Sequence, residues 1–128
     1  MEQTRQATIL VVDDDEFNLK LLSKMLAVQG HAIRTANSGE AALASVAEQL
    51  PDLILLDVMM PGIDGFEVAR RLKADAHTST IPVVMVTALE DRESRLKGLA
   101  TGAEEVLSKP VNRAELQMRV NKLLERFC

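Results

Sequence analysis

The sequence has 128 residues, of which 47% are hydrophobic and 27% are charged, the balance of an ordinary globular domain. Its net charge of −4 argues against direct binding to DNA or an anionic membrane, and its 2% of aromatic residues exclude a stacking platform for single-stranded nucleic acid. No apolar run is long enough to span a membrane, residues 1–7 contain no signal-peptide core, and the single cysteine, Cys128, excludes an internal disulfide.

We therefore expect one cytoplasmic domain over residues 1–128, with residues 1–7 as an N-terminal tail. Short apolar runs alternate along the chain with segments whose apolar residues have helical spacing. The expected strands are residues 8–12, 32–36, 53–56, 82–86 and 105–107. The expected helices are residues 16–29, 37–49, 66–73, 91–101 and 112–128.

This alternation predicts an α/β fold with a five-stranded parallel sheet, five helices on its two faces and right-handed crossovers. For five such units the common doubly wound arrangement is flavodoxin-like, with strand order 2-1-3-4-5. The first and third strands then lie side by side. The crevice at the carboxyl ends of such strands is where open α/β sheets bind ligands.

The third expected strand is a run of four large apolar residues, 53–56, which is typical of a central strand buried on both faces. Asp57 follows this run directly, and the chain then turns at Pro61-Gly62. A lone aspartate at such a place often does no more than cap the following turn. The ends of the other strands decide between this interpretation and a functional one.

Polar residues stand where four of the expected strands end. They are Asp13, Asp14, Asp57, Thr87 and Lys109. Each alone has an ordinary explanation as a helix cap, a strand residue or a solvated lysine, but the predicted topology places all of them around one crevice. Carboxylates so close together repel one another unless a cation lies among them, and oxygen ligands without His or Cys favour Mg²⁺.

A metal-held carboxylate that faces a lysine and a threonine suits phosphoryl transfer. Asp57 would attack and become an acyl phosphate, while Mg²⁺ and the ammonium of Lys109 offset the charge on the transferring oxygens. The hydroxyl of Thr87 can donate a hydrogen bond to the phosphoryl group. His31 and His77 fall in expected loops away from this edge, and we expect both to be plain surface residues.

Five segments match a known family in order and spacing. They are VVDD at 11–14, LDVMMPGIDG at 56–65, VTA at 86–88, GA at 102–103 and KP at 109–110. Through them the chain resembles, over nearly its whole length, the receiver domain of bacterial two-component response regulators. The resemblance implies that a phosphoryl group passes from a phosphohistidine of a sensor histidine kinase or phosphotransfer protein to Asp57.

The resemblance also implies the roles of the neighbouring residues. Asp14 and Asp57 would hold Mg²⁺ directly, while Asp13 would help through water and the backbone carbonyl of Met59 would be a further ligand. The domain would catalyse only its own phosphorylation and dephosphorylation, so it would not be an enzyme in the usual sense. It would switch conformation to control an output domain or a downstream partner.

In the family the counterparts of Thr87 and Lys109 contact the phosphoryl oxygens. The bond before the matching proline is cis, so we expect a cis Lys109-Pro110 peptide that fixes the lysine over the site. Asp15 has no place in the family pattern, and we expect it to cap the first helix.

One departure from the family pattern concerns the switch, and two further positions concern the lifetime of the phosphoryl state. Val106 stands where the family usually has a Tyr or Phe that turns inward together with the threonine. We therefore expect a muted or differently wired rearrangement of the fourth helix, fifth strand and fifth helix. Met59 and Leu89 occupy the positions that tune attack by water; because both are apolar, we expect a long-lived phosphoryl group.

Two other functions fit parts of the pattern. A Mg²⁺-dependent phosphatase of the haloacid-dehalogenase type needs a second aspartate where this chain has Met59, and it needs a cap insertion. A phosphorylation-independent docking module usually loses a site residue, whereas all five are present here. The sequence leaves the output of the domain open. Residues 67–73 and 87–95 look most like receivers joined to cyclic-di-GMP enzymes, and a stand-alone regulator is the alternative. One expected assembly is a homodimer through the fourth helix, fifth strand and fifth helix.

Overall fold

A computed structural model describes residues 6–88 and 92–127, so Leu89 and Cys128 lie outside the described residues. Within the described residues, the strands are β1 (Thr8–Val12), β2 (Ala32–Ala36), β3 (Leu53–Asp57), β4 (Val83–Thr87) and β5 (Glu105–Ser108). The helices are α1 (Glu16–Ala27), α2 (Gly39–Glu48), α3 (Gly65–Ala74), α4 (Arg92–Ala100) and α5 (Arg113–Phe127). In this part of the chain no helix is long and apolar enough to cross a membrane.

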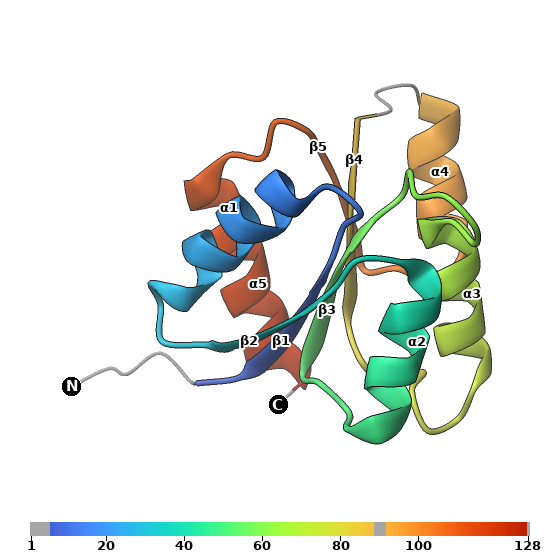
Figure 1. Ribbon diagram of the computed structural model, residues 1–128, viewed down its shortest axis with the longest axis horizontal. Coiled ribbons are helices and arrows are strands. Elements are labelled where there is room, and N and C mark those ends of the chain that lie inside the picture. The colour runs from blue at the N-terminus through green and yellow to red at the C-terminus, as the bar shows by residue number, and fades with distance from the viewer. Residues whose placement is uncertain (1–5, 89–91, 128) are drawn as a thin grey trace.

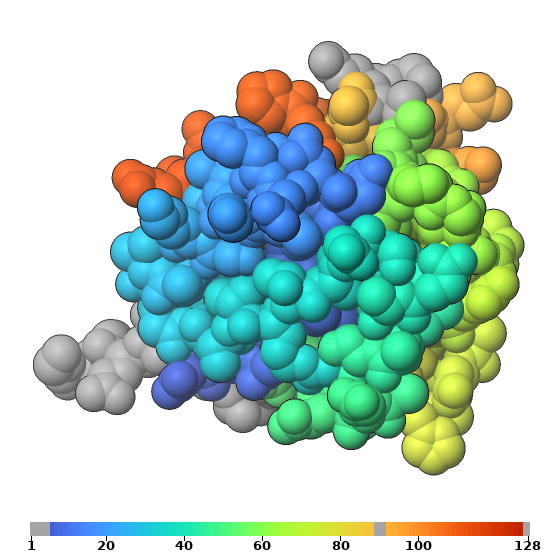
Figure 2. All heavy atoms as spheres, in the orientation of Figure 1, coloured from blue at the N-terminus to red at the C-terminus, as the bar shows by residue number. Residues whose placement is uncertain are grey.

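The strands form one parallel sheet in the order β2-β1-β3-β4-β5. Helices α1 and α5 cover one face of this sheet, and α2, α3 and α4 cover the other (Figure 1). In the space-filling view, α1 and α2 form much of the surface that faces the reader (Figure 2). The predicted flavodoxin-like topology is therefore confirmed, with β1 and β3 adjacent at the switch point.

The central strands are buried on both faces, as their continuous apolar runs predict. Leu10 and Ile54 pack into the core beneath α2 and α3, whereas Ile9 and Leu55 pack beneath α1 and α5. This division follows from the alternation of side chains along a strand. Because a one-residue slip would move every side chain to the wrong face, the two cores fix the register and hold the residues at the strand ends in place.

Three strands extend one residue further than their apolar runs predict. Asp57, Thr87 and Ser108 are the last residues of β3, β4 and β5. They belong to the strands because the ladder continues past the apolar residues, with Asp57 opposite Val86 and Thr87 opposite Ser108. The polar residues at this edge are thus held by sheet pairing as well as by the loops that follow.

Side chains cap α1, α2, α3 and α5, which leave this edge of the sheet. Asp15 Oδ1 accepts a hydrogen bond from the backbone N–H of Phe17 at 2.9 Å, which confirms Asp15 as the cap of α1. Ser38, Asp64 and Asn112 cap α2, α3 and α5 in the same way. The first helical turns are therefore anchored beside the strand ends that carry the polar residues.

The prediction that His31 is a surface residue is wrong. Its side chain is buried, with 5% exposure, and its Nδ1 accepts a hydrogen bond from the backbone N–H of Ala7 at 3.2 Å. Ala7, which the sequence analysis placed in the N-terminal tail, is itself buried. The imidazole fills space where the segment before β1 meets β2 and α5, so packing overrides its polar character. His77 is exposed, as predicted.

We expect His31 to make the domain less stable in mild acid. Burial lowers the pKa of His31 from its ordinary value of 6.5, although the nearby amide of Asn121 partly opposes the shift. Because the folded-state pKa is below the unfolded one, the stability is present above about pH 6.5 and is lost as the pH falls through the lowered pKa. At pH 7.5, His31→Asn should have a lower free energy of unfolding than the parent. Urea unfolding at pH 7.5 and 5.5 should show that this difference is smaller at pH 5.5. A gap that stays constant between pH 7.5 and pH 5.5 would contradict this assignment.

Candidate functional site

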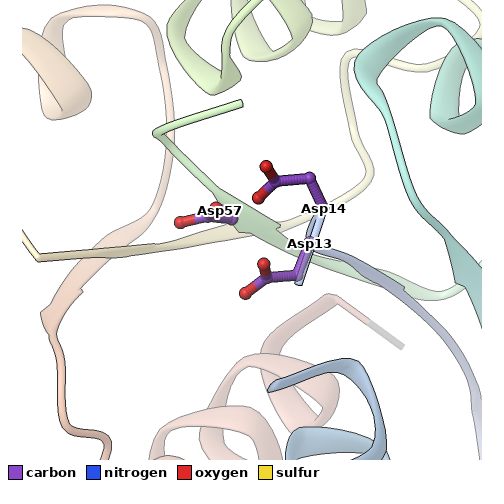
Figure 3. A group of neighbouring side chains, drawn as sticks. All are labelled: Asp13, Asp14 and Asp57. Carbon is purple, nitrogen blue, oxygen red and sulfur yellow. The ribbon is translucent and has the colours of Figure 1, made fainter. Parts of the chain in front are cut away.

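Three carboxylates meet at the carboxyl ends of β1 and β3. Asp13 and Asp14 follow β1, Asp57 ends β3, and one oxygen from each lies within 4.8 Å of the others. Figure 3 shows the three side chains turned toward the same space. Asp13 and Asp57 are buried, whereas Asp14 is exposed. The adjacency of β1 and β3 brings together residues that are far apart in the sequence.

Lys109 joins this cluster from the end of β5. Its Nζ lies 3.2 Å from Asp13 Oδ2 and 3.1 Å from Asp57 Oδ1, and its side chain is 23% exposed. The peptide bond between Lys109 and Pro110 is cis, as the resemblance implied. One cation thus faces two buried carboxylates and leaves the cluster with excess negative charge.

The crowding of acidic groups shows in the ionisation of Asp57. Burial, followed by repulsion from Asp13, raises the pKa of Asp57 to about 6, while Lys109 opposes the rise and Asp14 adds to it. Burial disfavours the ammonium of Lys109, but its contacts with Asp57 and Asp13 outweigh this effect and raise the pKa of the lysine. The positive charge of Lys109 therefore does not fully offset the cost of a charged Asp57 at this place.

Thr87 lies beside this cluster as the last residue of β4. Its side chain is buried, and its carbonyl accepts a hydrogen bond from the N–H of Lys109 at 2.8 Å. The backbone of the threonine is therefore tied to that of the lysine. The structure thus brings four sequence-predicted residues into direct proximity and places Thr87 at the end of the neighbouring strand.

Of the other predicted residues, Met59 and Val106 are described and Leu89 is not. Met59 exposes 55% of its surface on the loop after β3, so its apolar side chain is open to solvent. Val106, which stands where the resembled family usually has a Tyr or Phe, is a buried residue of β5. Leu89, the second position expected to affect the lifetime of a phosphoryl group, is not among the described residues.

The carboxylate cluster fits a hard divalent cation. Both oxygens of Asp13 already accept hydrogen bonds, Oδ1 from the N–H of Asp15 and Oδ2 from Lys109. Asp57 Oδ1 is buried and, apart from its close approach to the lysine ammonium, makes no hydrogen bond. A buried carboxylate oxygen whose neighbouring lysine is shared with Asp13, beside the exposed residue Asp14, is an arrangement that a Mg²⁺ ion would satisfy.

Gly65 is a residue of this site to which the sequence analysis gave no role. A Cβ at this position would lie 2.3 Å from the carbonyl oxygen of Asp57 and 2.8 Å from the Cα of Val58. The N–H of Gly65 donates to the carbonyl of Val58 at 2.9 Å, so the first turn of α3 rests directly on the backbone after β3. A glycine directly after the helix cap Asp64 was the available signal.

Fold and site together define a doubly wound α/β domain with three carboxylates and a lysine clustered at its switch point. The model of the family described as "Response regulator receiver domain" matches residues 9–121. A match over most of the chain shows the family, and the chain belongs to the response regulator receiver domains.

Similar proteins agree with this assignment. The response regulator PleD of Caulobacter vibrioides is 51% identical over 91% of this chain, which spans only 26% of PleD. Protein PilH of Pseudomonas aeruginosa is 37% identical, and the match covers 92% of this chain and 98% of PilH. The BeF3-activated DrrB receiver domain superposes with a TM-score of 0.86 at 36% identity, over 95% of this chain and 100% of that one. Relatives thus include a protein of about the same size and one much longer.

Proposed function

We propose that this domain accepts a phosphoryl group on Asp57 from a phosphohistidine of a sensor histidine kinase or phosphotransfer protein. The observation that carries the proposal is the buried carboxylate of Asp57, 3.1 Å from Lys109 Nζ at the edge where the strands end. In the transfer, an Asp57 oxygen forms the new bond to phosphorus, and the P–N bond to the donor histidine breaks with its electrons left on the imidazole.

The residues around Asp57 would have distinct tasks. Asp57 and Asp14 would hold Mg²⁺ together with the backbone carbonyl of Met59, and Asp13 would act through water because its own oxygens are engaged. Bound Mg²⁺ would supply positive charge that offsets the charge on the transferring oxygens. Lys109 would shift from the carboxylates to a phosphoryl oxygen, and the Thr87 hydroxyl would donate to another.

The proposal includes a switch but no turnover of an external substrate. The phosphorylated domain would control an output domain or a separate partner, and the lengths of its relatives allow either arrangement. Met59 cannot serve as the general acid that a phosphatase would need two residues after its nucleophile. We therefore propose a signalling domain whose only chemistry is the gain and loss of its own phosphoryl group.

Intact-mass measurement after incubation with acetyl phosphate and Mg²⁺ tests the proposal. The parent protein should gain about 80 Da, the mass of one phosphoryl group. Asp57→Asn should gain nothing, while the exposed control Asp75→Asn should behave like the parent. A parent that gains no mass with any phosphoryl donor, or an Asp57→Asn variant that gains the same mass, would contradict the proposed function.

A further inference from the structure

Helix α4 is attached to the sheet differently from the other helices on its face. Of its described residues, Gly98 alone is buried, and its two leucines, Leu96 and Leu99, expose 55% and 42% of their surfaces. Helix α3, by contrast, buries Phe66, Val68, Ala69 and Leu72. The side chains of α4 therefore contribute little apolar area of their own to the core.

Polar contacts take the place of the missing apolar anchors. Arg95 Nη1 donates a hydrogen bond to the carbonyl oxygen of Val106 at 2.9 Å, which joins α4 to the middle of β5. The ammonium of Lys97 lies 4.6 Å from the centre of the Phe66 ring. Each such contact is modest in free energy and can be exchanged for water.

Close backbone packing makes the Arg95 contact geometrically possible. A Cβ on Gly98 would lie 3.0 Å from Val106 Cγ2 and 3.1 Å from Met85 Sδ, so the glycine lets α4 approach the sheet over a valine. Val106 is buried and has no aromatic ring that could turn between two positions. The hydrogen bond from the Arg95 guanidinium to the carbonyl of Val106 is a directional link between α4 and β5.

The same helix is close in sequence to the proposed site of phosphorylation. Residues 88–91 connect Thr87, at the end of β4, with Arg92, where α4 begins. A phosphoryl group adds about 1.5 to 2 negative charges beside Thr87, which favours any state in which that hydroxyl moves toward it. A shift at the end of β4 then acts on a helix whose own side chains reach the sheet and α3 through polar contacts.

We propose that Arg95 is a positioning residue that latches α4 onto the carbonyl of Val106 and that release of this latch is coupled to phosphorylation of Asp57. This inference rests on the proposed function. In the domain without a phosphoryl group the latch is closed and α4 lies on β5. In the phosphorylated domain the equilibrium shifts toward an open latch and a displaced α4. The latch replaces the aromatic switch that this chain lacks.

Two measurements on Arg95→Gln test the latch, with Arg92→Gln as a control that removes the same charge from an exposed position of the same helix. Hydrogen exchange of the backbone amides in residues 92–100, measured without phosphoryl donor, should accelerate about threefold to tenfold in Arg95→Gln only. The affinity for beryllofluoride with Mg²⁺ should rise by a similar factor in Arg95→Gln, because coupling between two equilibria is reciprocal.

The outcomes separate this inference from the proposed function. Unchanged exchange in Arg95→Gln, or faster exchange with unchanged beryllofluoride affinity, would overturn the coupled latch while the parent still gains its phosphoryl group. Equal effects of Arg92→Gln would also overturn it, since a general loss of positive charge would then explain the result. If the parent neither gains mass nor binds beryllofluoride, the proposed function fails, and the coupling proposed for Arg95 fails with it.

Discussion

In metal-free solution at pH 7.5, Asp57→Asn should raise the free energy of unfolding by roughly 2 kcal/mol, although it removes the proposed phosphoryl acceptor. The reason is the burial of a charged carboxylate, to which repulsion from Asp13 adds. Asp57 is buried beside Asp13, one lysine serves both carboxylates, and the pKa of Asp57 is raised to about 6. An asparagine of similar shape carries no charge and avoids both the cost of burying a charge and the repulsion from Asp13.

The predicted difference in stability between Asp57→Asn and the parent should depend on pH. The folded-state pKa of Asp57, about 6, is above its ordinary value of 3.8, so its contribution to stability is fully present below about pH 3.8. That contribution is lost as the pH rises through about 6. The stability advantage of Asp57→Asn should therefore narrow by roughly half at pH 5. Urea unfolding of both proteins at pH 7.5 and 5 measures the gap.

Mg²⁺ should reverse the order of stability or remove most of the difference. An ion that binds only the folded state stabilises it, and the effect grows with the logarithm of the ion concentration once that concentration exceeds the dissociation constant. The free energy of unfolding of the parent should therefore rise as Mg²⁺ is added. Asp57→Asn should gain less, because a neutral amide is a poorer ligand than a carboxylate. A parent whose unfolding midpoint does not respond to Mg²⁺, or a metal-free Asp57→Asn that is less stable than the parent at pH 7.5, would show that the buried charge of Asp57 does not govern the stability of this site.

The topology and the grouping of the polar residues could be predicted from the sequence because both follow from the positions of the apolar runs. Continuous apolar runs such as 53–56 indicate strands buried on both faces, and parallel strands place their carboxyl ends at one edge. This arrangement predicts that Asp13, Asp57 and Lys109 lie near one another. In the structure Lys109 Nζ lies 3.2 Å from Asp13 Oδ2 and 3.1 Å from Asp57 Oδ1. No side-chain geometry was needed to predict their proximity.

Features that depend on packing between distant segments could not be derived in this way. His31 stands directly after Gly30 in an apparently polar connection, and only the packing of Ala7 and α5 around it explains its burial. The attachment of α4 through Arg95 also escaped prediction, because an arginine on an amphipathic helix usually faces solvent. Local pattern predicts which face of an element is apolar, but it does not predict which backbone carbonyl a long side chain reaches.

Gly65→Ala should destabilise the domain by about 3 kcal/mol and also impair phosphorylation of Asp57. The added methyl group would meet backbone atoms, with the carbonyl oxygen of Asp57 at 2.3 Å, its carbon at 3.0 Å and the Cα of Val58 at 2.8 Å. Backbone held in a central strand cannot turn away as a flexible side chain could. Either α3 moves outward or the end of β3 shifts, and the second response displaces the carboxylate at the centre of the proposed site.

Gly30→Ala separates this steric effect from the general cost of replacing a glycine. A Cβ at Gly30 would meet no atom within 4 Å, but its φ of +92° disfavours any other residue, so this variant should lose only about 1 kcal/mol. Urea unfolding measures both stabilities, and intact mass after acetyl phosphate and Mg²⁺ measures modification. Gly65→Ala should be slower to gain the phosphoryl group under conditions in which it remains folded, whereas Gly30→Ala should match the parent. Equal losses of stability in the two variants, with normal modification of Gly65→Ala, would mean that α3 retreats freely and that its contact with β3 does not position Asp57.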